Sequence, residues 1–155
     1  MKNFKKRYVI YLIIVLALLV VPFVEESFNL NMDKTRNLLK TTVNKEYVEK
    51  AHKGDLRKFY HVDFDNLEDF ILYVPATTMR VNEIAIIKPK KGQEDMFLKA
   101  MENRRDCQKK VFEGYGPKQC KLLDNSILYK KGSFIIYIVG EDSKVIEEAI
   151  EKGAK

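Results

Sequence analysis

Residues 133–139 read Ser133-Phe134-Ile135-Ile136-Tyr137-Ile138-Val139, and this run indicates how the domain is layered. It is apolar at odd and at even positions, whereas a strand with one face in water alternates apolar and polar residues. We therefore predict a strand with both faces covered. Lys131-Gly132, just before it, predicts a hairpin turn from a strand over 127–130. Because successive short hairpins pair antiparallel, the sheet is expected to be mainly antiparallel.

The rest of the chain alternates strand-like and helix-like patterns. Strands are predicted over 70–74, which Pro75 ends, and over 83–87, and Cys120 is expected to begin a strand. Helices are predicted over 33–51, 55–60 and 93–113, and from Asp142 or Ser143 onwards. The sequence thus predicts an α+β fold: an extra N-terminal helix, then a two-layer β-β-α-β-β-α domain with a four-stranded sheet.

A different pattern fills the N-terminus. Tyr8 to Val24 contains 17 residues without a charge, and a helix of that length spans about 25 Å, the lower limit for crossing a bilayer. The alternatives are a cleaved signal peptide and a lipoprotein signal. No small residues give a cleavage site after the run, and neither cysteine lies near it. We therefore predict an uncleaved transmembrane signal anchor.

Charge gives the orientation of this anchor. Lys2, Lys5, Lys6 and Arg7 precede it, which predicts a cytoplasmic N-terminus. We expect a cytoplasmic basic tip at 1–7, the anchor at 8–24, a spacer at 25–32 and an extracytoplasmic domain at 33–155. The expected location is the cell membrane, in a single pass. Without the four basic residues, 24 basic and 22 acidic residues remain, so no nucleic-acid partner is expected.

Several short motifs together resemble one bacterial family, that of domain of unknown function 4358. They are Leu56-Arg57-Lys58-Phe59-Tyr60 with Val62-Asp63, Asn82-Glu83-Ile84-Ala85-Ile86, Arg104, Gln108, Phe112, Tyr115 and Gln119, and Lys131-Gly132-Ser133-Phe134. The resemblance covers roughly 39–150. It implies an extracytoplasmic domain of a Gram-positive bacterium, often tethered as a lipoprotein, and it implies no activity. This chain departs from that pattern because it lacks the lipoprotein cysteine and has a helix anchor instead.

One polar group stands out on the predicted helix over 93–113. Three or four residues separate successive members of one row along this stretch, which predicts a single helix face: Phe97, Met101, Arg104, Gln108, Val111 and Tyr115. A charged group such as Arg104 on that face must find a partner or line a groove. Glu83, in the preceding strand, is the expected partner. One interpretation is a structural ion pair between helix and sheet. The other is a polar groove in which Arg104, Gln108 and Tyr115 face a ligand or partner.

Cys107 and Cys120 are the two cysteines of the chain. A helix followed by a strand can bring such positions together, and an oxidising location permits a disulfide, which is one hypothesis. The alternative is two free thiols that pack as small apolar groups.

Motifs for common chemistries are missing from the sequence. His52 and His61 have no zinc-ligand pattern around them, and the acids from Asp63 to Asp69 do not follow the EF-hand order. No G-x-S-x-G, no S-x-x-K and no glycine-rich phosphate loop occurs. We therefore expect no metal, no cofactor and no catalytic residue.

Two functions remain, and the sequence favours the first. The first is a non-catalytic interaction module of the cell envelope that contacts another envelope protein or a wall component. The second is a small-ligand-binding or sensory domain that uses a groove near Arg104 and Tyr115. A pocket with converging polar groups favours the second, and a filled seam between helix and sheet counts against it.

Overall fold

The computed structural model describes residues 11 and 28–154. Within this part the chain forms a five-stranded antiparallel sheet in the order β1-β2-β3-β5-β4. The strands are β1 (Val48–Lys50), β2 (Leu67–Pro75), β3 (Glu83–Pro89), β4 (Ile127–Lys131) and β5 (Phe134–Val139). The helices are α2 (Met32–Thr42), α3 (Lys53–Tyr60), α4 (Glu94–Phe112), α5 (Pro117–Asp124) and α6 (Ser143–Ala154), with a 3₁₀ turn at Phe64–Asn66.

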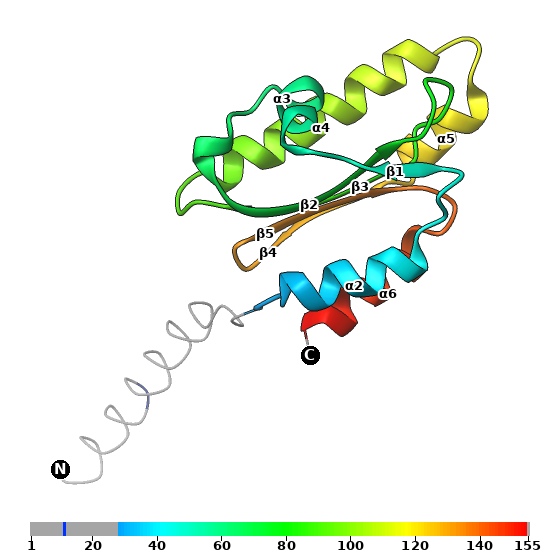
Figure 1. Cartoon of the computed structure of the whole chain (residues 1–155). Helices are drawn as coiled ribbons and strands as arrows, with labels where there is room; N and C mark the ends of the chain where they lie inside the picture. Colours follow the sequence, from blue (N-terminus) through cyan, green and yellow to red (C-terminus); the bar gives the residue numbers. More distant parts are fainter. Residues whose placement is uncertain (1–10, 12–27, 155) are drawn as a thin grey trace, which may run out of the picture.

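The sheet is covered on both faces (Figure 1). One face of β5, with Ile135 and Tyr137, packs into a core with residues of α3, α4 and α5. The opposite face, with Ile136 and Ile138, packs into a core with residues of α2 and α6. The prediction that both faces of this strand are covered is therefore confirmed. The two-layer architecture is wrong: the domain has three layers, because a strand that is apolar at every position requires helices on both sides.

The first predicted helix was too long. The sequence pattern predicts a helix over 33–51, but α2 ends at Thr42 and residues 48–50 form β1, which makes the sheet five-stranded rather than four-stranded. Thr41, Thr42 and Val43 are β-branched, which lowers their helix propensity. The Asn44 side chain then accepts a hydrogen bond from the backbone N–H of Glu46 and turns the chain.

Cys120 also lies in a different element from the one predicted. It was expected to begin a strand but lies in the short helix α5, which starts at Pro117. Proline is favoured in the first turn of a helix because its missing N–H would have no partner there. The predicted helices over 55–60, 93–113 and from 142 or 143 correspond to α3, α4 and α6, and the hairpin turn at Gly132 (φ 57°) is confirmed.

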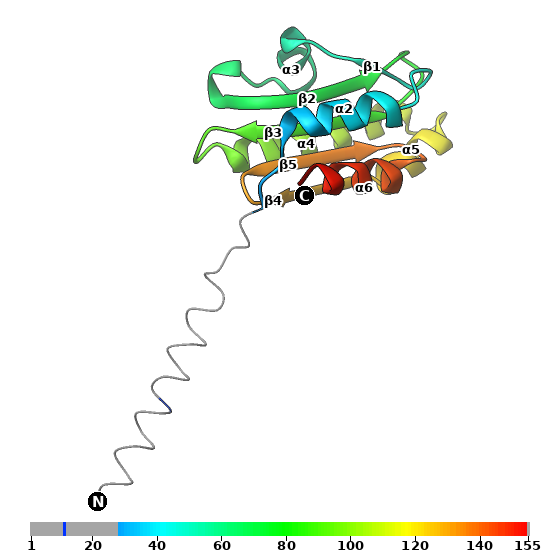
Figure 2. The same cartoon turned by 60° about the horizontal axis from the view of Figure 1, so that its bottom comes forward.

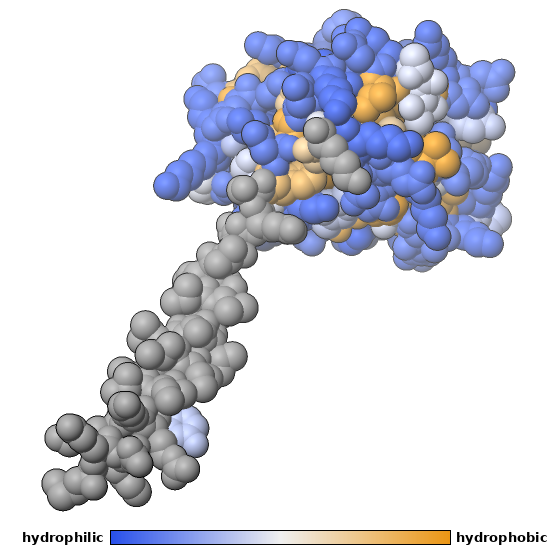
Figure 3. Space-filling model, turned by 90° about the horizontal axis from the view of Figure 1, so that it is seen from below, coloured by the Kyte–Doolittle hydropathy of each residue, from blue (hydrophilic) through white to orange (hydrophobic). Residues whose placement is uncertain are grey.

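The chain enters the domain on the α2/α6 side, where these two helices lie side by side (Figure 2). Phe28 packs edge-on against Phe134, with ring centroids 6.0 Å apart, and the Asn31 N–H donates to the Gly153 carbonyl at 3.2 Å. The first and last residues of the described domain are thus close together. Seen from this side, the visible surface is mainly hydrophilic, with apolar residues scattered over it (Figure 3).

The predicted anchor at 8–24 lies outside the described residues, apart from Tyr11. Among the residues that are described, no helix is both long enough and apolar enough to span a bilayer.

Candidate functional site

Helix α4 lies across the sheet and brings polar residues to its boundary. Its buried residues are Phe97, Met101, Gln108 and Phe112, spaced four or seven apart, as expected for one face of a helix. Arg104 falls in the same row and reaches Glu83 at the start of the central strand β3. The spacing of three or four residues predicts that Val111 also lies on this buried face. Val111 is instead 60% exposed, and Phe112 takes the buried position.

Glu83 is the centre of a buried polar cluster below α4. Its side chain is 0% exposed and lies at the start of β3. The Arg104 guanidinium donates to Glu83 Oε2 from Nε at 3.2 Å and from Nη2 at 2.9 Å. The Tyr60 hydroxyl, from α3, donates to Glu83 Oε1. The predicted Arg104–Glu83 pair is therefore confirmed, and Tyr60 is a second partner that the sequence reasoning missed.

Two buried tyrosines surround this carboxylate. Burial raises the pKa of the Tyr60 hydroxyl well above its ordinary value, and the charge of Glu83 raises it further. Burial likewise raises the pKa of Tyr137, with Glu83 again adding to the effect. The Tyr137 hydroxyl has no hydrogen-bond partner among the described residues.

These raised pKa values predict a loss of stability at alkaline pH. The folded state holds both protons more tightly than the unfolded chain, whose tyrosines titrate near pH 10. Stability from these groups is therefore complete below pH 10 and falls as the pH rises above it, by about 1 kcal/mol for each tyrosine between pH 10 and 11. Urea unfolding at both pH values measures this loss. Tyr137→Phe should remove about 1 kcal/mol of it, and an unchanged loss in that variant would contradict the assignment.

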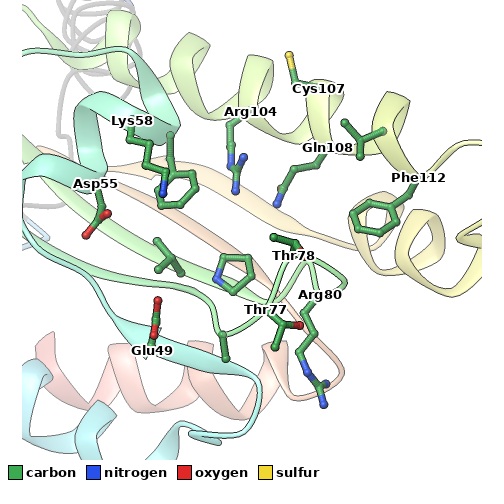
Figure 4. Close-up of a pocket in the computed structure, with 15 residues that line it drawn as sticks. Glu49, Asp55, Lys58, Thr77, Thr78, Arg80, Arg104, Cys107, Gln108 and Phe112 are labelled. Atoms are coloured by element: carbon green, nitrogen blue, oxygen red, sulfur yellow. The ribbon is translucent and has the colours of Figure 1, made fainter.

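A groove with a volume of about 480 Å³ opens beside the cluster (Figure 4). Four elements form it: α3, α4, β1 and the end of β2 with the loop over 76–82. Its lining residues are Glu49, Asp55, Lys58, Phe59, Val74, Pro75, Ala76, Thr77, Thr78, Arg80, Arg104, Cys107, Gln108, Val111 and Phe112. The apolar members form its walls, and the polar members come from opposite sides of it. A groove of this composition can bind an organic ligand or a protein segment.

The loop over 76–82 is fixed at two points, so this wall is preorganised. The Gln119 side chain, from α5, donates from Nε2 to the Met79 carbonyl at 3.1 Å. The Arg80 guanidinium lies over the Tyr47 ring, 4.2 Å from its centroid. Sequence reasoning missed this loop as part of the site.

Gln108 has an unsatisfied polar atom in the wall of the groove. The residue is 6% exposed, and its side chain points from α4 towards the space below the helix (Figure 4). Its Oε1 atom is buried without a hydrogen-bond partner among the described residues. Leaving a buried acceptor unpaired costs about 1–3 kcal/mol. A buried acceptor without a partner in a folded protein calls for a specific explanation.

Tyr115 and the two cysteines lie elsewhere. Tyr115 follows the end of α4, is 60% exposed and packs beside Phe112 without lining the groove. Gly114, at φ 89°, has already turned the chain away. Both cysteines are free thiols, so the disulfide is not formed in this structure. Cys107 lines the groove only at its edge and points away from the cavity (Figure 4), whereas Cys120 lines a separate hollow.

One protein family matches the chain. Its sequence model covers residues 41–140, and its description is "Domain of unknown function (DUF4358)". The matched segment contains β1 to β5 and α3 to α5, and thus the whole groove and the Glu83 cluster. No curated protein and no solved structure matches the chain.

Proposed function

The chain belongs to the family of domain of unknown function DUF4358. We propose that it is a non-catalytic binding domain that a membrane anchor holds outside the cytoplasm. In this proposal residues 8–24 are the anchor, and the groove beside α4 is the binding site. The proposal combines the two sequence-level functions: an envelope interaction module that takes its partner in the groove near Arg104.

The observation that carries the proposal is Gln108. A seam between α4 and the sheet that served only packing would be filled, and a buried side-chain amide in it would normally be paired. Here the seam opens into a groove, and Gln108 keeps an unpaired oxygen in its wall. Arg104 lies one turn away, with its Nε and Nη2 atoms bonded to Glu83. Its Nη1 atom donates no hydrogen bond to any described residue and can therefore donate to a ligand.

The orientation of the groove fits a tethered domain. The chain enters on the α2/α6 face, beside Phe134, whereas the groove lies on the α3/α4 face, next to the loop over 76–82 (Figure 1). The groove is therefore on the opposite side of the sheet from the point where the tether enters, so the tether does not block it.

Photocrosslinking in intact cells tests this function. The photoreactive residue p-benzoylphenylalanine is placed at Thr78, on the exposed rim of the groove, and separately at Glu148, exposed on α6. We expect a discrete adduct from Thr78 and none from Glu148. Equal adducts from both positions would contradict a binding groove.

A pair of matched tryptophan substitutions makes this test specific. Val111 lines the groove and is 60% exposed, and Val145 on α6 is 57% exposed and lines no part of it. Val111→Trp should fill the groove and remove the Thr78 adduct without disturbing the core, whereas Val145→Trp should leave it unchanged. An adduct that survives Val111→Trp would also count against the proposal.

A further inference from the structure

The groove is extended rather than compact. A second hollow of about 400 Å³ adjoins it and shares Lys58, Phe59, Arg104 and Cys107 with it. Together the two hollows follow α4 from Met96 to Phe112. At 1.5 Å rise per residue this is about 24 Å, the length of about seven residues of extended polypeptide. The shape therefore suits an elongated segment rather than a small compact molecule.

Aromatic rings along the groove are already covered. The Phe59 ring has the Arg104 guanidinium 4.6 Å and the Lys58 ammonium 5.0 Å from its centroid. The other aromatic residues that line the two hollows, Tyr60 and Phe112, are buried. A sugar chain binds most readily by packing its rings on open aromatic faces. The lining of this groove offers cations on those faces instead, which disfavours a glycan.

The charges that line the groove nearly balance one another. Lys58 and Arg80 are matched by Glu49 and Asp55, and Arg104 is matched by the buried Glu83, which leaves Lys99 of the second hollow as one positive charge in excess. A polyanionic partner would require a larger excess of positive charge. The groove therefore suits a ligand that is close to neutral overall and carries both donors and acceptors.

The polar group at the centre of the groove is an amide. Gln108 carries one acceptor oxygen and one donor nitrogen, and its terminal torsion is broad, so either atom can turn towards a ligand. A peptide unit presents the same pair of groups, a carbonyl oxygen and an N–H. Val74, Pro75 and Val111 provide aliphatic walls on either side for a neighbouring side chain.

From these four features we infer that the occupant of the groove is an extended segment of a partner polypeptide, nearly neutral, with at least one apolar side chain. The segment lies along α4. One of its peptide units pairs with the Gln108 amide, and one of its carbonyl oxygens accepts from Arg104 Nη1. Its apolar side chain fills the hollow against Val74 and Pro75. This inference rests on the proposed function.

A peptide selection tests the inference. The full chain, in lipid nanodiscs, is offered a random linear heptapeptide library on phage, with counter-selection against the Val111→Trp chain. The selected peptide is then titrated against the wild-type chain and the Gln108→Met and Val145→Trp variants. We expect saturable binding that Gln108→Met weakens about tenfold, the loss of about one good hydrogen bond, and that Val145→Trp leaves unchanged. Chitohexaose in its fully N-acetylated, uncharged form is titrated in parallel and should not bind.

The outcomes separate the inference from the function on which it rests. If no peptide survives the counter-selection, or if the selected peptide binds Gln108→Met as tightly as the wild-type chain, the inference is wrong. Chitohexaose binding that Val111→Trp abolishes would also overturn it, but would leave the groove as a binding site. A Thr78 adduct without peptide binding would likewise overturn the inference and leave the groove as a binding site. If the Thr78 adduct is missing too, the proposed function fails with it.

Discussion

Arg104→Met is expected to lower the free energy of unfolding by about 3–5 kcal/mol, the usual cost of removing one partner of a buried ion pair. The carboxylate of Glu83 is 0% exposed, and without Arg104 it keeps only the Tyr60 hydroxyl as a partner. Methionine retains much of the volume of the arginine stem, so the loss reports on the charge rather than on a cavity. Urea unfolding of the full chain in detergent measures the effect.

A neighbouring arginine provides the matched control. Arg105 pairs with Asp106 at the surface, at 3.2 Å, and exposed pairs contribute at most about 1 kcal/mol. Arg105→Met should therefore have little effect. The double variant Glu83→Gln/Arg104→Met should recover at least about 2 kcal/mol of the loss, because it no longer buries an unpaired charge. If Arg104→Met unfolds like the wild-type chain, the pair does not hold α4 on the sheet, and Arg104 serves the groove alone.

Much of the fold could be predicted from the sequence where burial imposes a clear period. The continuous apolar run at 134–138 required covering on both faces, and the spacing of Phe97, Met101 and Gln108 identified the longest helix and its inner face. The same argument identified Glu83 as the partner of Arg104. A glutamate that begins an apolar strand opposite a helical arginine has few other ways to compensate its charge.

The parts that sequence patterns did not reveal depend on contacts between distant segments. β1 has only three residues, and its pairing with Val74 and Pro75 gives no periodic signal. Proline at the start of α5 and the turn at Gly114 likewise decide local structure without a hydrophobic pattern.

The same limit applies to the groove. Its outer wall is the loop over 76–82, which contacts with distant residues hold in place. Gln119, which bonds to Met79, comes 40 residues later in the chain, and Tyr47, which packs under Arg80, comes 33 residues earlier. The helical spacing from Gln108 and Val111 predicts that Tyr115 lies in the groove. Helix α4 ends at Phe112, so this spacing no longer applies at Tyr115.

Labelling of Cys107 by a membrane-impermeant maleimide is expected to be all-or-none, because it depends on which side of the membrane holds the domain. Cys107 is exposed on α4, whereas Cys120 is partly buried. In intact protoplasts that produce the Cys120→Ser chain, the reagent should label Cys107 without permeabilisation. A chain that lacks both cysteines should give no signal.

A cysteine placed in the basic tip supplies the opposite control. Asn3→Cys, in the chain that lacks Cys107 and Cys120, lies before the proposed anchor and should react only after the membrane is opened. Comparison with the wild-type chain also tests the disulfide. If Cys107 reacts in the wild-type chain only after reduction, but reacts in Cys120→Ser without it, then Cys107 and Cys120 are bonded outside the cell. Labelling of Cys107 only after permeabilisation would contradict the proposed topology, because the domain would then lie on the cytoplasmic side together with the four basic residues before Tyr8. The groove would in that case face cytoplasmic partners, and the peptide that occupies it would have to come from there.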